Sequence, residues 1–208
     1  GEYTHREYEQ MYYAGADRYI LRREAADKCH FAKMHPKERF FDNRMSCLRD
    51  LRDIGFQTGY CFTVGSPYQT SHTLAENLKL IEEFQPDICT VEPFFSHKDS
   101  PSVSFRPESL LQMIYTLSLI RLVRPSILLF VSAAFGCIAE DGRERGIKAG
   151  ANAVAVNLSP ISVHDKYGLH DSKTDRGEIK QELEQLRILT ERIGYRTVFD
   201  GGEVKRLS

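Results

Sequence analysis

The feature of this sequence that most constrains its fold is the alternation of short apolar segments with amphipathic ones. The apolar segments have the length and composition of β-strands, and helical periodicity follows each of them. Such alternation, with strands apolar on both faces, is typical of an α/β domain whose parallel sheet is covered by helices. The expected strands are 18–22, 56–64, 87–91, 126–131 and 153–156; the expected helices are 6–14, 42–54, 73–84, 107–123, 142–149 and 178–193.

Two architectures fit this order of elements. A doubly wound open sheet needs a glycine-rich phosphate loop after its first strand, and neither G-x-G-x-x-G nor G-x-x-x-x-G-K occurs here. A closed (β/α) barrel needs about eight strands, which is more than this chain supplies. The absence of any linker-like stretch predicts one domain over residues 1–208. We therefore expect an incomplete TIM-type barrel of five parallel strands.

Composition excludes several classes of function. Hydrophobic residues make up 41% and charged residues 27% of the 208 residues, and the formal net charge is −1. No global basic field therefore draws the chain to nucleic acid or to anionic lipid. The longest mostly apolar stretch, Ile127 to Ala139, is shorter than the roughly 20 residues that span a bilayer. The polar first residues do not resemble a signal peptide, so we expect a cytoplasmic protein without membrane or nucleic-acid partners.

The cysteines predict neither disulfides nor a metal site. The chain has five of them, an odd number that is scattered along the sequence. A disulfide framework uses paired cysteines at close spacing, and zinc or iron–sulfur sites use local ligand motifs. We expect reduced, mostly buried thiols and assign no residue as a metal ligand. The cysteines are Cys29, Cys47, Cys61, Cys89 and Cys137.

Polar side chains gather where the expected strands end. Barrel enzymes place their chemistry at the carboxyl ends of their strands. Glu24 follows the first strand, Glu92 the third, Ser132 the fourth and Asn157 the fifth. We therefore expect these four side chains near the same edge of the sheet.

Six segments in register resemble one family. They look like segments of the FeFe-hydrogenase maturases of the HydE type, in the branch of the radical S-adenosylmethionine (SAM) superfamily that also contains biotin synthase. The resemblance places this chain in the later two-thirds of such an enzyme, with its strands corresponding to strands 4–8 of the barrel. The segments are Ala16–Asp27, His35–Pro36 with Asn43–Arg44, Val64–Thr70, Pro93–Pro101, Gly142–Glu144 with Gly150–Asn152, and Asn157–Pro160.

The resemblance implies a cofactor and roles for named residues. The family uses a 4Fe–4S cluster, held by a C-x-x-x-C-x-x-C loop, to cleave SAM into a radical that abstracts hydrogen from a small-molecule substrate. It implies that Glu24 contacts the SAM ribose hydroxyls and that Arg44 binds the SAM carboxylate, a natural use of a guanidinium fork. Ser132 matches an anion-binding position, Glu92 stands where glycine is usual, and Asn157 could line the cavity or cap its loop. No catalytic residue follows from the resemblance.

Three readings of function remain open at this point. The first is a fragment of a HydE-like radical SAM enzyme, active in hydrogenase maturation or in related small-molecule radical chemistry. The second is a paralogue that resembles biotin synthase or methylornithine synthase. The third is a non-catalytic half-barrel that serves as a scaffold or partner, and the missing cysteine triad favours it for this chain alone. Because an incomplete barrel has unpaired strand edges, self-association through those edges is also expected.

We predict that no stoichiometric iron–sulfur cluster assembles on this 208-residue chain alone. Such clusters are held by closely spaced cysteine thiolates, and the chain has no C-x-x-x-C-x-x-C segment. Anaerobic reconstitution followed by iron and sulfide analysis measures this directly. A stoichiometric 4Fe–4S signal that responds to added SAM would show the prediction to be wrong.

Overall fold

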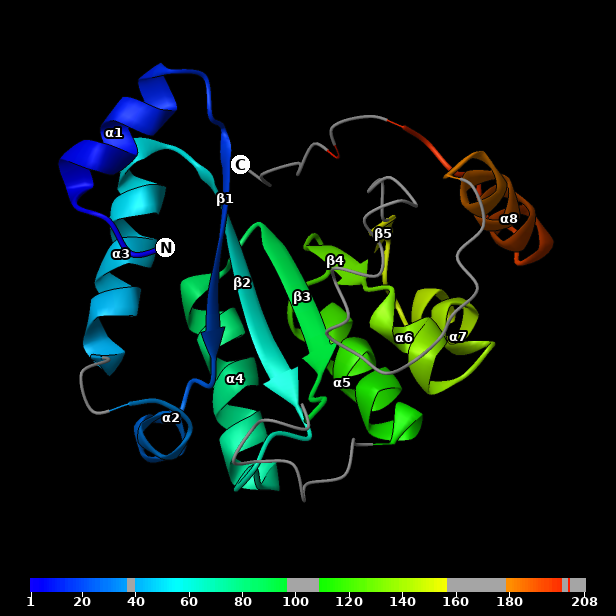
Figure 1. Ribbon diagram of the computed structural model, residues 1–208, viewed down its shortest axis with the longest axis horizontal. Helices are drawn as coiled ribbons and strands as arrows, with labels where there is room; N and C mark the ends of the chain where they lie inside the picture. Colours follow the sequence, from blue (N-terminus) through cyan, green and yellow to red (C-terminus); the bar gives the residue numbers. More distant parts are fainter. Residues whose placement is uncertain (37–39, 97–108, 157–178, 200–201, 203–208) are drawn as a thin grey trace.

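A computed structural model describes residues 1–36, 40–96, 109–156, 179–199 and 202. One or two helices separate each strand from the next along the chain (Figure 1). The elements are α1 His5–Tyr13, β1 Arg18–Glu24, α2 Lys28–Met34, α3 Phe41–Ile54, β2 Gln57–Val64, α4 Ser71–Phe84, β3 Ile88–Pro93, α5 Leu110–Val123, β4 Leu128–Val131, α6 Ala134–Ile138, α7 Gly142–Lys148, β5 Ala153–Val154 and α8 Ile179–Arg192.

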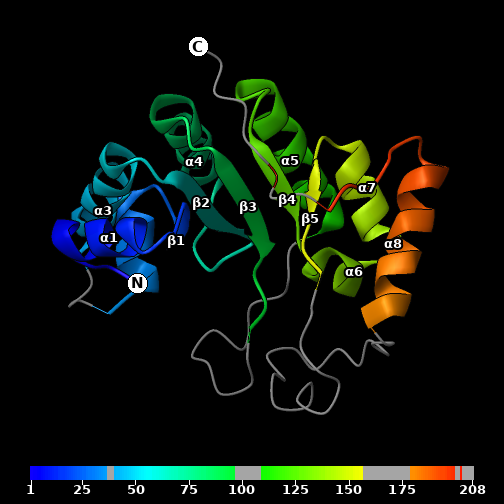
Figure 2. The same ribbon diagram turned by 90° about the horizontal axis from the view of Figure 1, so that it is seen from above.

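The strands form one five-stranded sheet in the order β1-β2-β3-β4-β5, and every neighbouring pair is parallel. Seen along the arc in Figure 2, the sheet curves, with α3, α4, α5 and α7 on its outer side. This confirms the predicted incomplete barrel of parallel strands. Within the described residues β1 and β5 are the two edges of the sheet, so the barrel does not close.

Side chains alternate between the two faces of each strand and separate an apolar outer layer from a more polar concave face. On β2, Tyr60 and Phe62 are fully buried in the core that forms between the sheet and the outer helices. A buried polar network crosses this layer, because the Tyr60 hydroxyl donates to Asn77 Oδ1 at 2.6 Å. The same oxygen accepts from the backbone N–H of Ala26 at 3.0 Å, so Asn77 on α4 ties β2 to the segment after β1.

Two predicted helix starts are wrong in detail. Asp42, the predicted first residue of α3, lies inside the helix and pairs with Lys28 at 3.2 Å. The N-cap is Phe40, which makes no side-chain cap bond. Helix α4 begins at Ser71, two residues before the predicted start at 73, and its capping box starts at Thr70, whose hydroxyl accepts from the N–H of Thr73. Several residue types can cap a helix, so tertiary contacts choose among nearby candidates. The short helices α2 and α6 were not predicted, since seven and five residues carry little periodicity.

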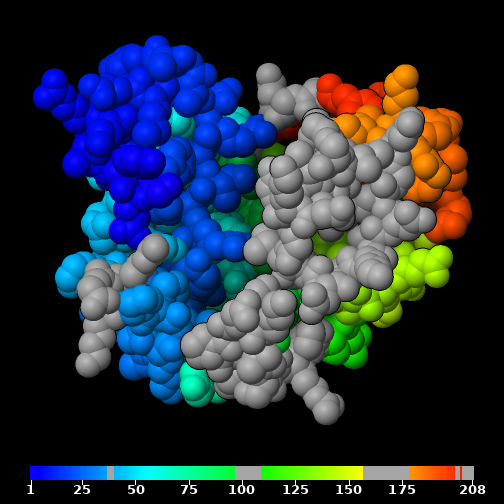
Figure 3. Space-filling model, viewed as in Figure 1, coloured from blue at the N-terminus to red at the C-terminus, as the bar shows by residue number. Residues whose placement is uncertain are grey.

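The first helix, α1, and the last described helix, α8, lie on opposite sides of the molecule (Figure 3). Self-association through the edges of β1 and β5 stays a prediction. None of the helices in the described part of the chain combines the length and the apolar character needed to cross a membrane.

We predict that Asn77→Ala lowers the free energy of unfolding by about 2–4 kcal/mol, because it leaves the Tyr60 hydroxyl and the Ala26 N–H without their partner. Chemical denaturation of the two proteins measures the difference. The matched control is Gln181→Ala, which removes an exposed amide from α8 and should change stability little. A loss no larger than that of the control would contradict the proposed importance of the network.

Candidate functional site

A β-bulge lies at the end of β1, where three consecutive charged residues, Arg22 to Glu24, have different surroundings. The parallel register pairs Arg22 with Cys61 and then Glu24 with Phe62, so Arg23 is an extra residue on β1. Glu24 has φ of 63°, a left-handed conformation that is uncommon for residues other than glycine. Arg23 is buried, Glu24 is half-buried and Arg22 is exposed. The bulge therefore turns the Glu24 carboxylate out of the regular strand alternation.

Arg44, on the first turns of α3, meets Glu24 at this point. Its Nη1 donates to Glu24 Oε2 at 2.7 Å and also to the carbonyl oxygen of Arg22. Its Nε donates to Glu2 Oε1 at 2.7 Å, and its side chain is only 8% exposed. His35 Nε2 lies 3.2 Å from the same Glu24 oxygen. The two residues that the sequence predicted for cofactor binding are thus in direct contact, although their role in binding is a separate question.

A second polar group lies along the concave face at the ends of β2, β3 and β4. Cα register places Cys61 beside Arg22 and Glu92 beside Thr63, so Cys61 and Glu92 share a face. Burial raises the pKa of the Glu92 carboxyl above its usual range, while Ser132 and Arg22 act in the opposite direction. The concave face therefore holds a carboxyl whose ionisation is disfavoured.

Ser132 follows β4 and is 7% exposed. Its hydroxyl lies close enough to lower the pKa of Glu92, but without the geometry of a hydrogen bond, so this buried oxygen lacks a partner among the described residues. Burial also raises the pKa of the Cys61 thiol, and the neighbouring Arg22 opposes that shift. This face offers a carboxyl, a guanidinium and an unsatisfied hydroxyl to any molecule that enters the arc.

Some residues of the candidate site were not predicted from the sequence. Arg22 and His35 stood in segments that were singled out, but no role was inferred for either. Strand alternation could have indicated Arg22, whereas nothing in the sequence pointed to Glu2 as a partner of Arg44. Asn157 lies outside the described residues. No group of three His, Cys, Asp or Glu residues within the described ranges is arranged to hold a metal ion.

Comparison with known proteins agrees with this geometry. The chain is 32% identical over 173 residues to the FeFe hydrogenase maturase subunit HydE of Thermotoga maritima, a match that covers 83% of this chain and 49% of the maturase. No family model matches the sequence.

Solved structures give the same architecture. Methylornithine synthase (PylB) has a TM-score of 0.73 at 21% identity, covering 94% of this chain and 56% of that one. HydG from Carboxydothermus hydrogenoformans has a TM-score of 0.68 at 15% identity, covering 94% and 46%. At these identities the likeness shows the fold alone.

The arc of parallel strands, together with the HydE match, defines a radical SAM β/α-barrel. The sequence match to HydE places the chain in the radical SAM superfamily, in the branch to which HydE belongs. The chain spans about half the length of the curated relative that it matches.

The residues at the end of β1 suit the polar groups of SAM. SAM carries ribose hydroxyls, a carboxylate and an ammonium group, and each needs a partner when it leaves water. Glu24 can accept hydrogen bonds from hydroxyls. Arg44 already binds carboxylates in this structure, those of Glu2 and Glu24, so its donors are directed at the type of group that SAM would present. The two residues therefore fit this cofactor.

We predict that Glu92→Gln changes how stability depends on pH. Because burial raises its pKa, the Glu92 carboxyl holds a proton more tightly in the folded chain than in the unfolded one. Its contribution to stability is then present below the unfolded pKa and is lost as pH rises through the raised folded pKa. When melting temperatures are measured from pH 4 to pH 8, the melting temperature of Glu92→Gln should rise relative to that of the unchanged protein as pH rises.

The matched control is Glu82→Gln, at an exposed position on α4, which should leave the pH profile unchanged. Parallel profiles for Glu92→Gln and the unchanged protein would contradict the prediction.

Proposed function

We propose that this chain supplies the SAM-binding and substrate-facing part of a radical SAM enzyme. The observation that carries the proposal is the contact between Glu24 and Arg44, two residues twenty positions apart that meet at the carboxyl end of β1. This end of the strands is where barrel enzymes carry their chemistry. The sequence match to HydE supports a role in hydrogenase maturation or in related radical chemistry on a small molecule.

Each residue has a separate task in this proposal. Arg44 binds the SAM carboxylate through its guanidinium fork, and Glu24 accepts from the ribose hydroxyls. His35, 3.2 Å from Glu24 Oε2 and stacked on Phe31, holds the carboxylate in place. In this superfamily, SAM reduced by a 4Fe–4S cluster supplies a carbon-centred radical that removes a hydrogen atom from the substrate.

The concave face indicates the type of substrate. Arg22 is an exposed donor suited to a carboxylate or another anionic group, while Glu92 and Ser132 can bind hydrogen-bond donors. We therefore propose a small polar substrate with both an acidic group and a donor group. The carboxyl of Glu92, at a position where the resembling maturases have glycine, favours a substrate different from theirs, as in a paralogue similar to methylornithine synthase.

We predict that SAM binds the isolated chain weakly, at the end of β1. Titration with SAM, followed by ¹H–¹⁵N NMR, should shift the amide signals of Arg22 to Glu24 and the Arg44 side-chain signal. Arg44→Gln or Glu24→Gln should weaken binding about 10- to 150-fold, which corresponds to about 1.5–3 kcal/mol for a lost charged hydrogen bond. Arg44→Lys should bind with intermediate affinity, because it keeps the charge and loses the fork.

Arg6→Gln, which removes an exposed arginine from α1, is the matched control and should leave the titration unchanged. Melting temperatures of all variants separate lost binding from lost folding. Chemical-shift changes confined to other parts of the sheet would contradict the SAM site. So would a SAM affinity of Arg44→Gln and Glu24→Gln that equals that of the unchanged chain. Either result would favour a scaffold without catalytic function.

A further inference from the structure

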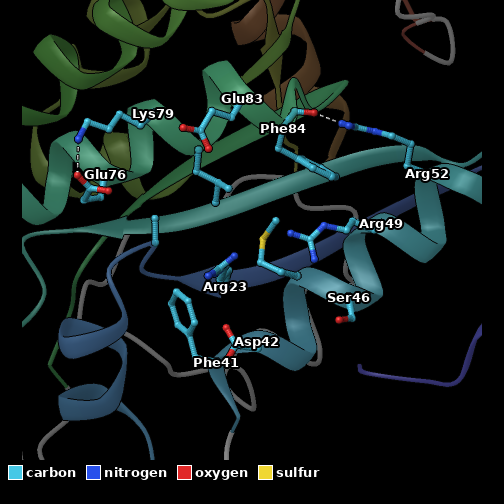
Figure 4. A pocket seen from close by; sticks show the side chains of 13 residues that line it. Arg23, Phe41, Asp42, Ser46, Arg49, Arg52, Glu76, Lys79, Glu83 and Phe84 are labelled. Carbon is cyan, nitrogen blue, oxygen red and sulfur yellow. Dashed lines mark hydrogen bonds and ion pairs between the residues drawn. The ribbon is translucent and has the colours of Figure 1, made fainter.

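A cavity lies on the opposite side of the sheet from the concave face. It has a volume of about 630 Å³ and opens between α3, α4 and the end of β1 (Figure 4). Arg23 lines it, whereas its neighbour Arg22 belongs to the concave face, as alternation along a strand requires. The Glu24–Arg44 contact does not line this cavity.

Arg23 is the unusual residue of this cavity. It is 2% exposed, and its Nε and Nη1 atoms have no hydrogen-bond partner among the described residues. Its guanidinium stacks on the Phe41 ring at 4.1 Å, a contact that covers one face of the group but satisfies none of its N–H donors. Burial lowers the pKa of Arg23, and the positive charges of Arg44 and Arg49 lower it further. The negative charge of Asp42 acts in the opposite direction. A buried cation of this kind is unfavourable unless a negative group pairs with it.

The other charged groups around the cavity are partly engaged. Lys79 pairs with Glu76 at 2.7 Å, and Asp42 pairs with Lys28 at 3.2 Å. Arg52 is stacked on Phe84 and donates to backbone carbonyls at the end of α4. Asp42 is the carboxylate of this group that also acts on Arg23, without forming a hydrogen bond to it.

Arg49 makes no hydrogen bond or ion pair with the described residues and acts on Arg23 only as a repelling charge. Glu83, exposed on α4, acts on Lys79. The Arg49 guanidinium extends into the cavity region, and Ser46 lies one turn away on the same helix (Figure 4). Two arginines without carboxylate partners therefore face one space.

We propose that this cavity binds a phosphate group through Arg23 and Arg49, with the Ser46 hydroxyl as a further donor. Guanidinium forks match the spacing of phosphate oxygens, and a doubly charged anion would offset the repulsion between the two arginines. Inorganic phosphate and a phosphomonoester of a small molecule present the same chemistry. A bound phosphate would connect the end of β1 to α3, the two elements that also carry Glu24 and Arg44. The binding proposal does not depend on the SAM site.

Thermal unfolding of the 208-residue chain tests the proposal. We expect the melting temperature to rise with phosphate or glycerol phosphate and to stay unchanged with chloride at matched ionic strength. Arg23→Met should weaken the apparent affinity at least about tenfold, and Arg49→Gln by about three- to tenfold. Asp42→Asn should strengthen binding, because it removes a carboxylate that competes for Arg23. Arg6→Gln is the control that should leave binding unchanged.

Phosphorus NMR line widths supply a second measurement that does not depend on melting, so the proposal can be tested even if Arg23→Met fails to fold. Saturable line broadening that Arg49→Gln weakens supports the proposal. The anion that binds with the higher affinity, phosphate or glycerol phosphate, indicates which type of ligand the cavity prefers. No saturable binding of either anion to the unchanged chain would overturn it. So would a phosphate response that survives Arg23→Met at full strength.

Discussion

The alternation of side chains along the parallel strands is the constraint on which the rest of this structure depends. One face of each strand must lie under the helices and be apolar, which leaves the other face available for polar groups. Tyr60 and Phe62 fill the outer layer, and Cys61 between them faces the concave side with Arg22. The core and the candidate site are therefore the two faces of the same sheet.

The bulge at the end of β1 interrupts the alternation of side chains at the candidate SAM site. Arg22 and Arg23 lie on opposite faces of β1, and the extra residue shifts Glu24 into register with Phe62. Glu24 then takes a left-handed conformation and meets Arg44 from α3. Uncommon backbone conformations of this kind persist only where surrounding contacts hold them, and here the contacts are with Arg44 and His35.

The two faces give the molecule two distinct polar environments. On the concave side, charges of both signs and the Ser132 hydroxyl can bind a ligand with both acidic and donor groups. Under the helices, the buried Arg23 is stacked on an aromatic ring, and Asp42, Arg44 and Arg49 act on its charge. The first arrangement suits a zwitterionic or mixed ligand, while the second suits an anion. Strand β1 contributes to both, through Arg22 on one face and Arg23 on the other.

The sequence by itself determined the fold class and the strand order, because five apolar segments separated by amphipathic helices leave few ways to bury both faces of a sheet. The resemblance to the maturase family also singled out Glu24 and Arg44, whose role in binding SAM stays a prediction. Tertiary structure alone decided that these two side chains touch, that Glu2 joins them, and that Arg23 is buried without a partner. Those facts depend on a one-residue bulge and on the packing of distant helices, and neither leaves a periodic signal in the chain.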